Sequence, residues 1–61
     1  MTLNELNKNQ ILQLKQSYLC NVKYEDQGVS WGMLANADSI VSNKELEQYY
    51  GGIEFSENDF S

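Results

Sequence analysis

One amphipathic segment near the start of the chain limits the possible folds more than any other feature. Its apolar residues recur at spacings of three and four, which places them on one face of a helix: Ile11, Leu14, Tyr18 and Val22. The pattern predicts a helix over residues 8 to about 24, with Lys8, Lys15 and Lys23 on its solvated side. Because 61 residues leave room for one small domain only, we expect residues 1–61 to fold around this helix.

The two ends of this helix carry local signals. Asn7 suits the N-cap, and Gln10 stands three residues later as the partner of a capping box. Leu6 and Ile11 occupy the positions of a hydrophobic staple. Residues 25–28 contain no apolar side chain and finish with glycine, so we predict the turn that ends the helix there.

A second helix start lies at Ser30. This residue suits the N-cap of a short helix that runs through Ala37. We expect Trp31, within that helix, to belong to the core, because an indole ring contributes a large buried area.

A third helix start lies at Ser42, which forms the pattern of a capping box with Glu45. The two consecutive glycines at 51–52 predict the end of this helix, since glycine adopts the left-handed conformation common after a helix. Tyr49 and Tyr50 are adjacent and point in different directions on a helix. We therefore expect one ring in the core and the other exposed.

The last segment alternates apolar and acidic residues from Ile53 to Phe55, which fits a short strand or an extended arm docked on the helices. Residues 56–59 resemble one more helix cap. The predicted fold class is mainly α: a small bundle of one long N-terminal helix, one or two short helices and an acidic C-terminal arm.

Charge is distributed unevenly along the chain. Residues 1–24 contain one acidic residue and three lysines, whereas residues 25–61 contain eight acidic residues and one lysine. The net charge of −5 for the chain is therefore concentrated in its second part. Such a charge can serve solubility alone. The more specific hypothesis is that the acidic groups of residues 38–59 form one surface that imitates nucleic-acid phosphates.

Composition argues against several functional classes. The chain has no histidine and one cysteine, so we expect no metal site, no internal disulfide and a reducing compartment. Cys20 is interpreted as a partly buried small side chain, and the acidic pairs at 25–26 and 57–59 as solvated surface rather than catalytic groups. We expect no enzyme activity and no cofactor. The acidic balance argues against direct binding of nucleic acid, and no apolar run or leader pattern indicates a membrane span or a secretion signal.

Residues 12–19, 30–41 and 53–60 together cover most of the chain. In these three segments the sequence resembles a group of very short acidic proteins carried by phages and conjugative elements of Gram-positive bacteria. Residues 25–29 stand where many members of the group have a longer acidic insertion. No catalytic motif comes with the group. The resemblance implies a bacterial cytoplasm and an inhibitor of host defence, such as a CRISPR nuclease or a restriction enzyme.

The resulting hypothesis is a non-catalytic inhibitor that binds the basic nucleic-acid groove of a host defence enzyme, partly by imitating DNA. The expected partner-binding residues are acidic groups and one aromatic anchor: Asp38, Glu45, Glu47, Tyr50, Glu54, Glu57 and Asp59. The alternative is a helical adaptor or regulatory subunit that packs through the apolar face of the first helix, on a partner or in a homodimer. Binding of the acidic arm to an unrelated protein also stays open.

Overall fold

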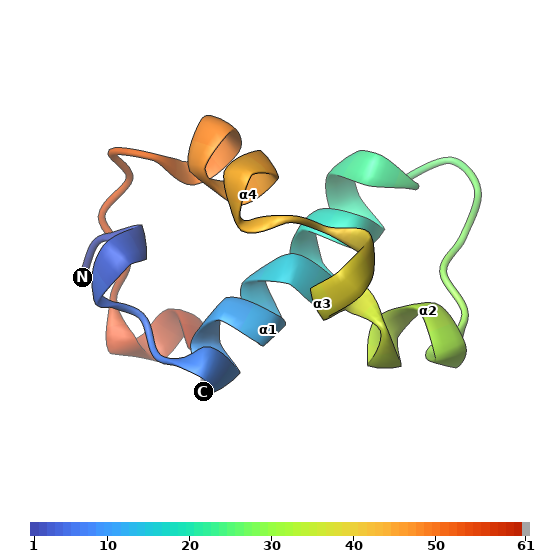
Figure 1. The fold of residues 1–61 in the computed structure, drawn as a ribbon, viewed down its shortest axis with the longest axis horizontal. Helices are drawn as coiled ribbons and strands as arrows, with labels where there is room; N and C mark the ends of the chain where they lie inside the picture. Colours follow the sequence, from blue (N-terminus) through green and yellow to red (C-terminus); the bar gives the residue numbers. More distant parts are fainter. Residues whose placement is uncertain (61) are drawn as a thin grey trace.

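The predicted first helix forms the axis of the molecule. In this computed structural model, which describes residues 1–60, α1 (Lys8–Tyr18) continues directly into a π-helical turn, η2 (Leu19–Lys23). The two together make a helix of 16 residues, and the other elements pack around it (Figure 1). The remaining elements are η1 (Leu3–Glu5), α2 (Trp31–Ala35), α3 (Ala37–Ile40), α4 (Asn43–Tyr50) and η3 (Glu57–Phe60).

The predicted capping box at the start of α1 is confirmed. The Gln10 N–H donates to Asn7 Oδ1, and the Asn7 N–H donates to Gln10 Oε1, both over 2.9 Å. These bonds satisfy backbone donors that have no partner within the helix. At the other end, the helix stops at Lys23 with Tyr24 as its C-cap, and a turn over residues 24–27 follows, as predicted. Gly28, after this turn, adopts a φ of 74°.

The second predicted helix is present, in two pieces. Ser30 Oγ accepts from the Met33 N–H over 3.3 Å, and Asn36 separates α2 from α3. The prediction that Trp31 lies in the core is wrong, because its side chain is 87% exposed. α2 is little more than one turn long and packs through Met33 and Leu34, so its first residue stays on the outer side.

α4 begins with half of the predicted capping box. Ser42 Oγ accepts from the Glu45 N–H over 3.1 Å. The Glu45 carboxylate does not return to the Ser42 backbone and instead accepts from Lys23 Nζ over 3.2 Å. The helix ends at Tyr50, and Gly52 adopts a φ of 85°, which agrees with the predicted stop at 51–52.

The core joins α1, η2, α3 and α4 through five buried side chains: Leu14, Leu19, Ala37, Val41 and Leu46. Lys15, next to the first of these, was expected on the solvated side of α1, and that expectation is wrong. Its side chain is only 4% exposed because α3 crosses α1 at this point and covers it. Charge alone therefore did not decide which residues of α1 face water.

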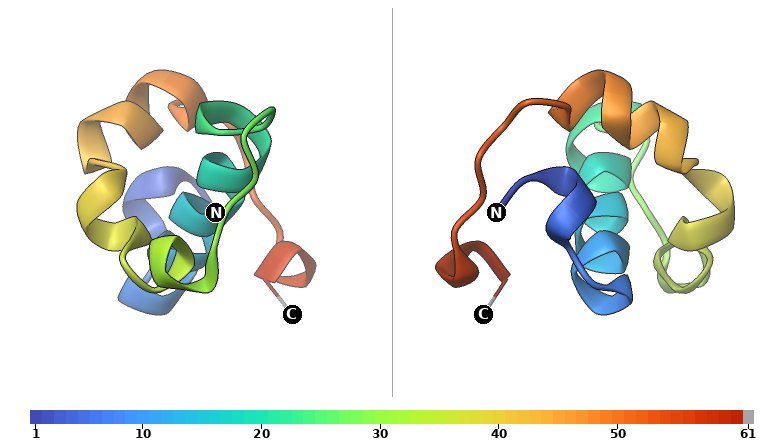
Figure 2. Two further views of the ribbon diagram at one scale, coloured as in Figure 1. Left: turned by 90° about the vertical axis from the view of Figure 1, so that its right-hand side faces the viewer. Right: turned by 60° about the vertical axis from the view of Figure 1, so that its left-hand side comes forward.

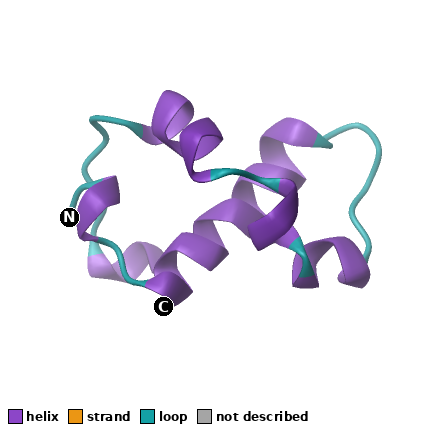
Figure 3. Cartoon of the chain, viewed as in Figure 1, coloured by secondary structure: helices purple, strands orange, loops and turns teal. Residues whose placement is uncertain are grey.

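The segment after α4 returns to the N-terminus. Met1 and Phe55 exchange two backbone hydrogen bonds of 2.6 Å, and Phe55 packs against the core. The Ser56 N–H donates to Asp59 Oδ2 over 2.9 Å and begins η3. The mainly helical class is confirmed, and residues 1–60 contain no strand (Figure 3). The acidic arm is not confirmed, because this segment is fastened beside α1 and η1 (Figure 2).

Candidate functional site

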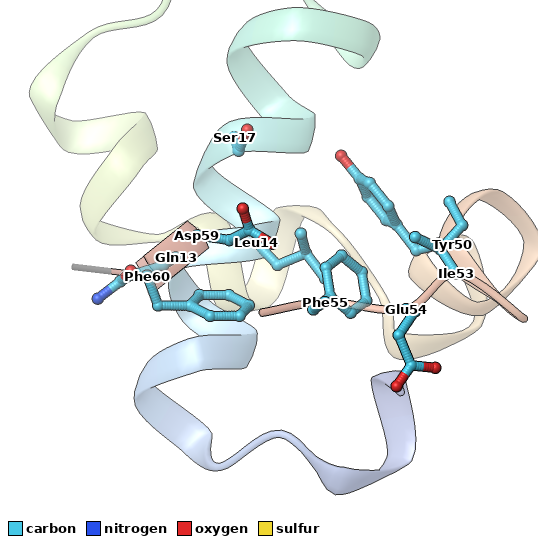
Figure 4. Close-up of a pocket in the computed structure, with 9 residues that line it drawn as sticks. All are labelled: Gln13, Leu14, Ser17, Tyr50, Ile53, Glu54, Phe55, Asp59 and Phe60. Carbon is cyan, nitrogen blue, oxygen red and sulfur yellow. The ribbon is translucent and has the colours of Figure 1, made fainter. Parts of the chain in front are cut away.

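A groove of about 410 Å³ lies between α1 and the C-terminal segment of residues 50–60. Figure 4 shows its lining, which comes from α1, from the end of α4, from the extended residues and from η3. The lining residues are Gln13, Leu14, Ser17, Tyr50, Ile53, Glu54, Phe55, Asp59 and Phe60. We call this feature the C-terminal groove.

Aromatic rings form a continuous series along the C-terminal groove. The ring centroids of Tyr50 and Phe55 are 5.9 Å apart, and those of Phe55 and Phe60 are also 5.9 Å apart. The series extends outside the groove to Tyr18 and Tyr49, whose centroids are 5.5 Å apart in an edge-to-face arrangement. Spacings of this size are typical of favourable aromatic pairs, so the rings also stabilise the return of the segment onto α1.

The charged side chains that line the C-terminal groove are both acidic. Glu54 is 80% exposed and lies 3.3 Å from the Met1 amino nitrogen. Asp59 accepts from the Ser56 N–H, a bond that orients the carboxylate without neutralising it. No lysine lines the groove, so its charge is negative at neutral pH.

One of the two adjacent rings, Tyr49, is exposed, as predicted, whereas Tyr50 is half-buried at the edge of the core rather than within it. Tyr50 packs against the core, and its burial raises the pKa of the phenol, with further increases from Tyr49 and Tyr18. Tyr49 is 53% exposed. Tyr50, the predicted aromatic anchor, lines the groove, but Tyr49 is the more accessible of the two rings.

Asp38 belongs to an ion pair inside the fold. Lys15 Nζ donates to Asp38 Oδ1 over 2.9 Å and to the Asp38 carbonyl over 3.2 Å. The hydrogen bond from Lys15, followed by the charge of its ammonium, holds the pKa of the Asp38 carboxyl below its ordinary value. This residue therefore connects α3 to α1.

Glu45 has a similar position between α4 and η2. Both of its carboxylate oxygens accept from Lys23 Nζ over 3.2 Å, and the same ammonium donates to the Ile40 carbonyl over 3.0 Å. Two of the three lysines of the first helix, Lys15 and Lys23, are thus partnered by acidic residues from the second part of the chain. The uneven charge of the sequence is used in part to hold the elements together.

The structure brings some of the expected contact residues together and separates others. Tyr50, Glu54 and Asp59 line the C-terminal groove, and Glu57 lies on the same short helix, η3, as Asp59. Asp38 and Glu47 line two other hollows. The acidic turn at 24–27 lies at the opposite end of the molecule from η3 (Figure 1). The prediction that residues 38–59 present a single acidic surface is therefore wrong for part of the set.

Sequence reasoning missed the contribution of α1 to the groove. Gln13, Leu14 and Ser17 line it, and their spacing places them on one side of the helix, which was the available signal. What the spacing could not show was which segment would cover that side.

Cys20 is exposed, which corrects its interpretation as partly buried. Within residues 1–60, no group of three His, Cys, Asp or Glu side chains is placed to hold a metal ion. None of the helices in this part of the chain is long and apolar enough to cross a membrane.

No family model, curated protein or solved structure matches this chain.

Proposed function

We propose that this chain is a non-catalytic inhibitor that binds the basic nucleic-acid groove of another protein. One observation carries the proposal, namely the excess of exposed acidic side chains that is left after the internal ion pairs form. Within residues 1–60, six carboxylates belong to no ion pair and all six residues are exposed, against two lysines without an ion pair. These acidic residues are Glu5, Glu25, Asp26, Glu47, Glu57 and Asp59.

Exposed carboxylates suit a partner that normally holds phosphates. They are anionic hydrogen-bond acceptors, and the lysines and arginines of a nucleic-acid groove bind such groups. An excess of one sign of charge also speeds the encounter with a partner of the opposite sign, and this effect weakens as salt is added. The proposed interaction is therefore strong at low ionic strength and steeply dependent on salt.

The acidic groups divide into two functional sets. Asp38 and Glu45 are already paired with lysines of the first helix, so we assign them to stability. Glu54, which stays 80% exposed beside the Met1 amino group, remains for contact with the partner together with Glu57, Asp59 and the rings of Tyr49 and Tyr50. Glu47 lines a separate hollow and is left outside this surface. The C-terminal groove is the centre of this proposed contact surface.

The resemblance to short acidic proteins of phages and conjugative elements narrows the class of partner. We propose a host defence enzyme that handles nucleic acid, such as a CRISPR nuclease or a restriction enzyme, encountered in the bacterial cytoplasm. The inhibitor acts by occupying the groove and needs no catalytic group of its own.

The alternative of a helical adaptor has less support. The apolar face of α1 was its proposed docking surface, but Leu14 is buried there, and Ile11 and Tyr18 pack against the core. The chain itself covers that face, so a partner helix would have to displace α3, α4 or the C-terminal segment.

The proposal is tested by capture followed by an activity measurement. The tagged chain is mixed with a Gram-positive lysate at low salt, and the captured proteins are eluted with duplex DNA. Each eluted protein is then purified and assayed for DNA binding and cleavage with and without the chain. We expect an eluted DNA-handling protein whose activity the chain inhibits, with inhibition that fades as salt is raised.

Two double variants provide a matched control. Glu57→Gln/Asp59→Asn removes two charges from η3, beside the C-terminal groove, and Glu25→Gln/Asp26→Asn removes two from the far turn. We expect the first variant to lose most of the inhibition and the second to keep it. Equal inhibition by both variants, or no inhibited protein at all, would refute the proposal.

A further inference from the structure

We propose that the C-terminal groove binds an arginine side chain from a basic segment of the partner. This inference rests on the proposed function and names the chemistry of its contact. The groove combines two features that favour a cation: a series of aromatic rings and a lining whose charged members are both carboxylates.

The aromatic rings supply the first part of the recognition. The rings of Tyr50, Phe55 and Phe60 follow one another at centroid distances of 5.9 Å, and Ile53 beside them is 43% exposed (Figure 4). An aromatic face carries partial negative charge and attracts a cation placed over it. Apolar surface next to the rings suits the methylene stem of a long basic side chain.

The carboxylates supply the second part. Asp59 has its Oδ2 oriented by the Ser56 N–H, and this is the only side-chain bond it makes within the described residues. Glu54 is 80% exposed and has one oxygen, Oε1, 3.3 Å from the Met1 nitrogen. Each carboxylate can therefore still accept a bond from a cation in the groove.

Arginine fits this combination better than lysine does. Its guanidinium group is planar, stacks on aromatic rings and donates two parallel bonds to a carboxylate, whereas the lysine ammonium is a compact and strongly hydrated charge. The volume of about 410 Å³ lies within the range of small-ligand sites, roughly 300–1,000 Å³.

A second copy of the chain is a poor occupant of the groove. Each copy has a net charge of −5, and the groove has no lysine in its lining. Pairing two such grooves would bring like charges together, which costs free energy. Charge complementarity therefore selects a basic partner over a homodimer at this surface.

The test is an NMR titration of the isotope-labelled chain with a capped peptide of alternating arginine and glycine. A peptide of the same length with lysine in place of arginine is titrated in parallel. We expect the arginine peptide to shift the amide signals of residues 50–60 and of Gln13 to Ser17, and to bind more tightly than the lysine peptide. An absence of shifts, or shifts centred on the turn at 24–27, would overturn the inference.

The matched variants are Asp59→Asn and Asp26→Asn. Each removes one charge, and the asparagine at 59 keeps an oxygen that can accept from the Ser56 N–H. We expect Asp59→Asn to weaken binding of the arginine peptide about two- to fivefold, the usual size of one exposed ion pair. Asp26→Asn should weaken it by less than about 1.5-fold at physiological salt, where charges act over about 8 Å. Equal effects would show non-specific attraction and overturn the inference.

A third variant, Phe60→Leu, tests the aromatic contribution while the acidic residues stay in place. It should weaken binding of the arginine peptide more than binding of the lysine peptide. An equal loss of affinity for both peptides would contradict the stacking geometry. Failure of the peptide tests with inhibition intact would reject the groove but not the proposed function. Peptide binding without any inhibited enzyme would reject the proposed function but not the groove.

Discussion

Lys15 and Asp38 form an ion pair across the boundary of the core, with Lys15 Nζ 2.9 Å from Asp38 Oδ1. The two partners differ greatly in exposure, since the lysine side chain is 4% exposed and the aspartate side chain 75%. The exposed Asp38 carboxylate therefore contacts the buried Lys15 ammonium from the solvent side. Its second bond, to the Asp38 carbonyl, fixes the end of the side chain against α3.

This asymmetry predicts unequal effects of removing either partner. Asp38→Asn leaves a buried ammonium without its counter-charge, which is costly. Lys15→Met removes the buried charge, keeps the apolar stem and leaves an exposed carboxylate that water can solvate. We expect Lys15→Met to change the free energy of unfolding by less than about 1 kcal/mol, and Asp38→Asn to destabilise the fold more. Urea unfolding measures both, and a larger loss for Lys15→Met would contradict the assignment.

The same pair predicts a dependence of stability on pH. The pKa of Asp38 is lowered in the folded chain by the hydrogen bond and the charge of Lys15. Its ionised form is thus favoured by folding, and the associated stability is present above the unfolded pKa, about 3.9. That stability is lost as the pH falls through the lower folded pKa.

Thermal unfolding of the wild type and of Asp38→Asn between neutral and strongly acidic pH measures this contribution. The difference in melting temperature between the two should be greatest at neutral pH and should shrink at acidic pH. Lys15→Met should flatten the acid dependence in the same way, because Asp38 then has no partner. A constant difference across the whole range would show that the pair does not couple folding to protonation.

Local signals in the sequence predicted the starts of α1, α2 and α4, but not η1 or the break between α2 and α3. Asn7 and Gln10 predicted the start of α1 because both halves of a capping box lie within one turn. The burial of Lys15 and the exposure of Trp31 were not predictable in the same way. Both depend on where α3 crosses α1 and on how short α2 is, and these are properties of the tertiary packing.

The candidate site was predictable only in part, for the same reason. Charge and aromatic character predict Tyr50, Glu54 and Asp59 as contact residues, and these three line one groove. The groove forms where the C-terminal segment lies beside α1, and hydrogen bonds between Met1 and Phe55 hold that segment in place. These two residues are far apart in sequence. No short-range pattern predicts such a contact.

The exposure of Trp31 predicts that its removal leaves the fold intact. Trp31→Ala should change the free energy of unfolding by no more than about 0.5 kcal/mol, as for other surface substitutions, because the side chain is 87% exposed. The fluorescence of this single tryptophan should also be quenched readily by acrylamide in the native chain. A clear loss of stability or strong protection from the quencher would place the ring in a packed environment instead.

The tight turn at Gly51, directly after α4, predicts that this position holds the C-terminal groove in place. A Cβ added at this position would collide with the Glu47 carbonyl at the end of α4, whereas a Cβ at Gly32 would have only an ordinary contact with Ser30. Gly51→Ala should therefore destabilise the fold by about 1–3 kcal/mol, and Gly32→Ala should stabilise it by up to about 1 kcal/mol through the higher helix propensity of alanine. Unfolding in urea compares the two.

Because Ile53, Glu54 and Phe55 follow the glycine pair at 51–52, Gly51→Ala should also weaken binding of the arginine peptide at temperatures where the variant is still folded. Gly32→Ala, on α2, should leave peptide binding unchanged. If Gly51→Ala kept both its stability and its affinity, the turn after α4 would not be what positions the groove.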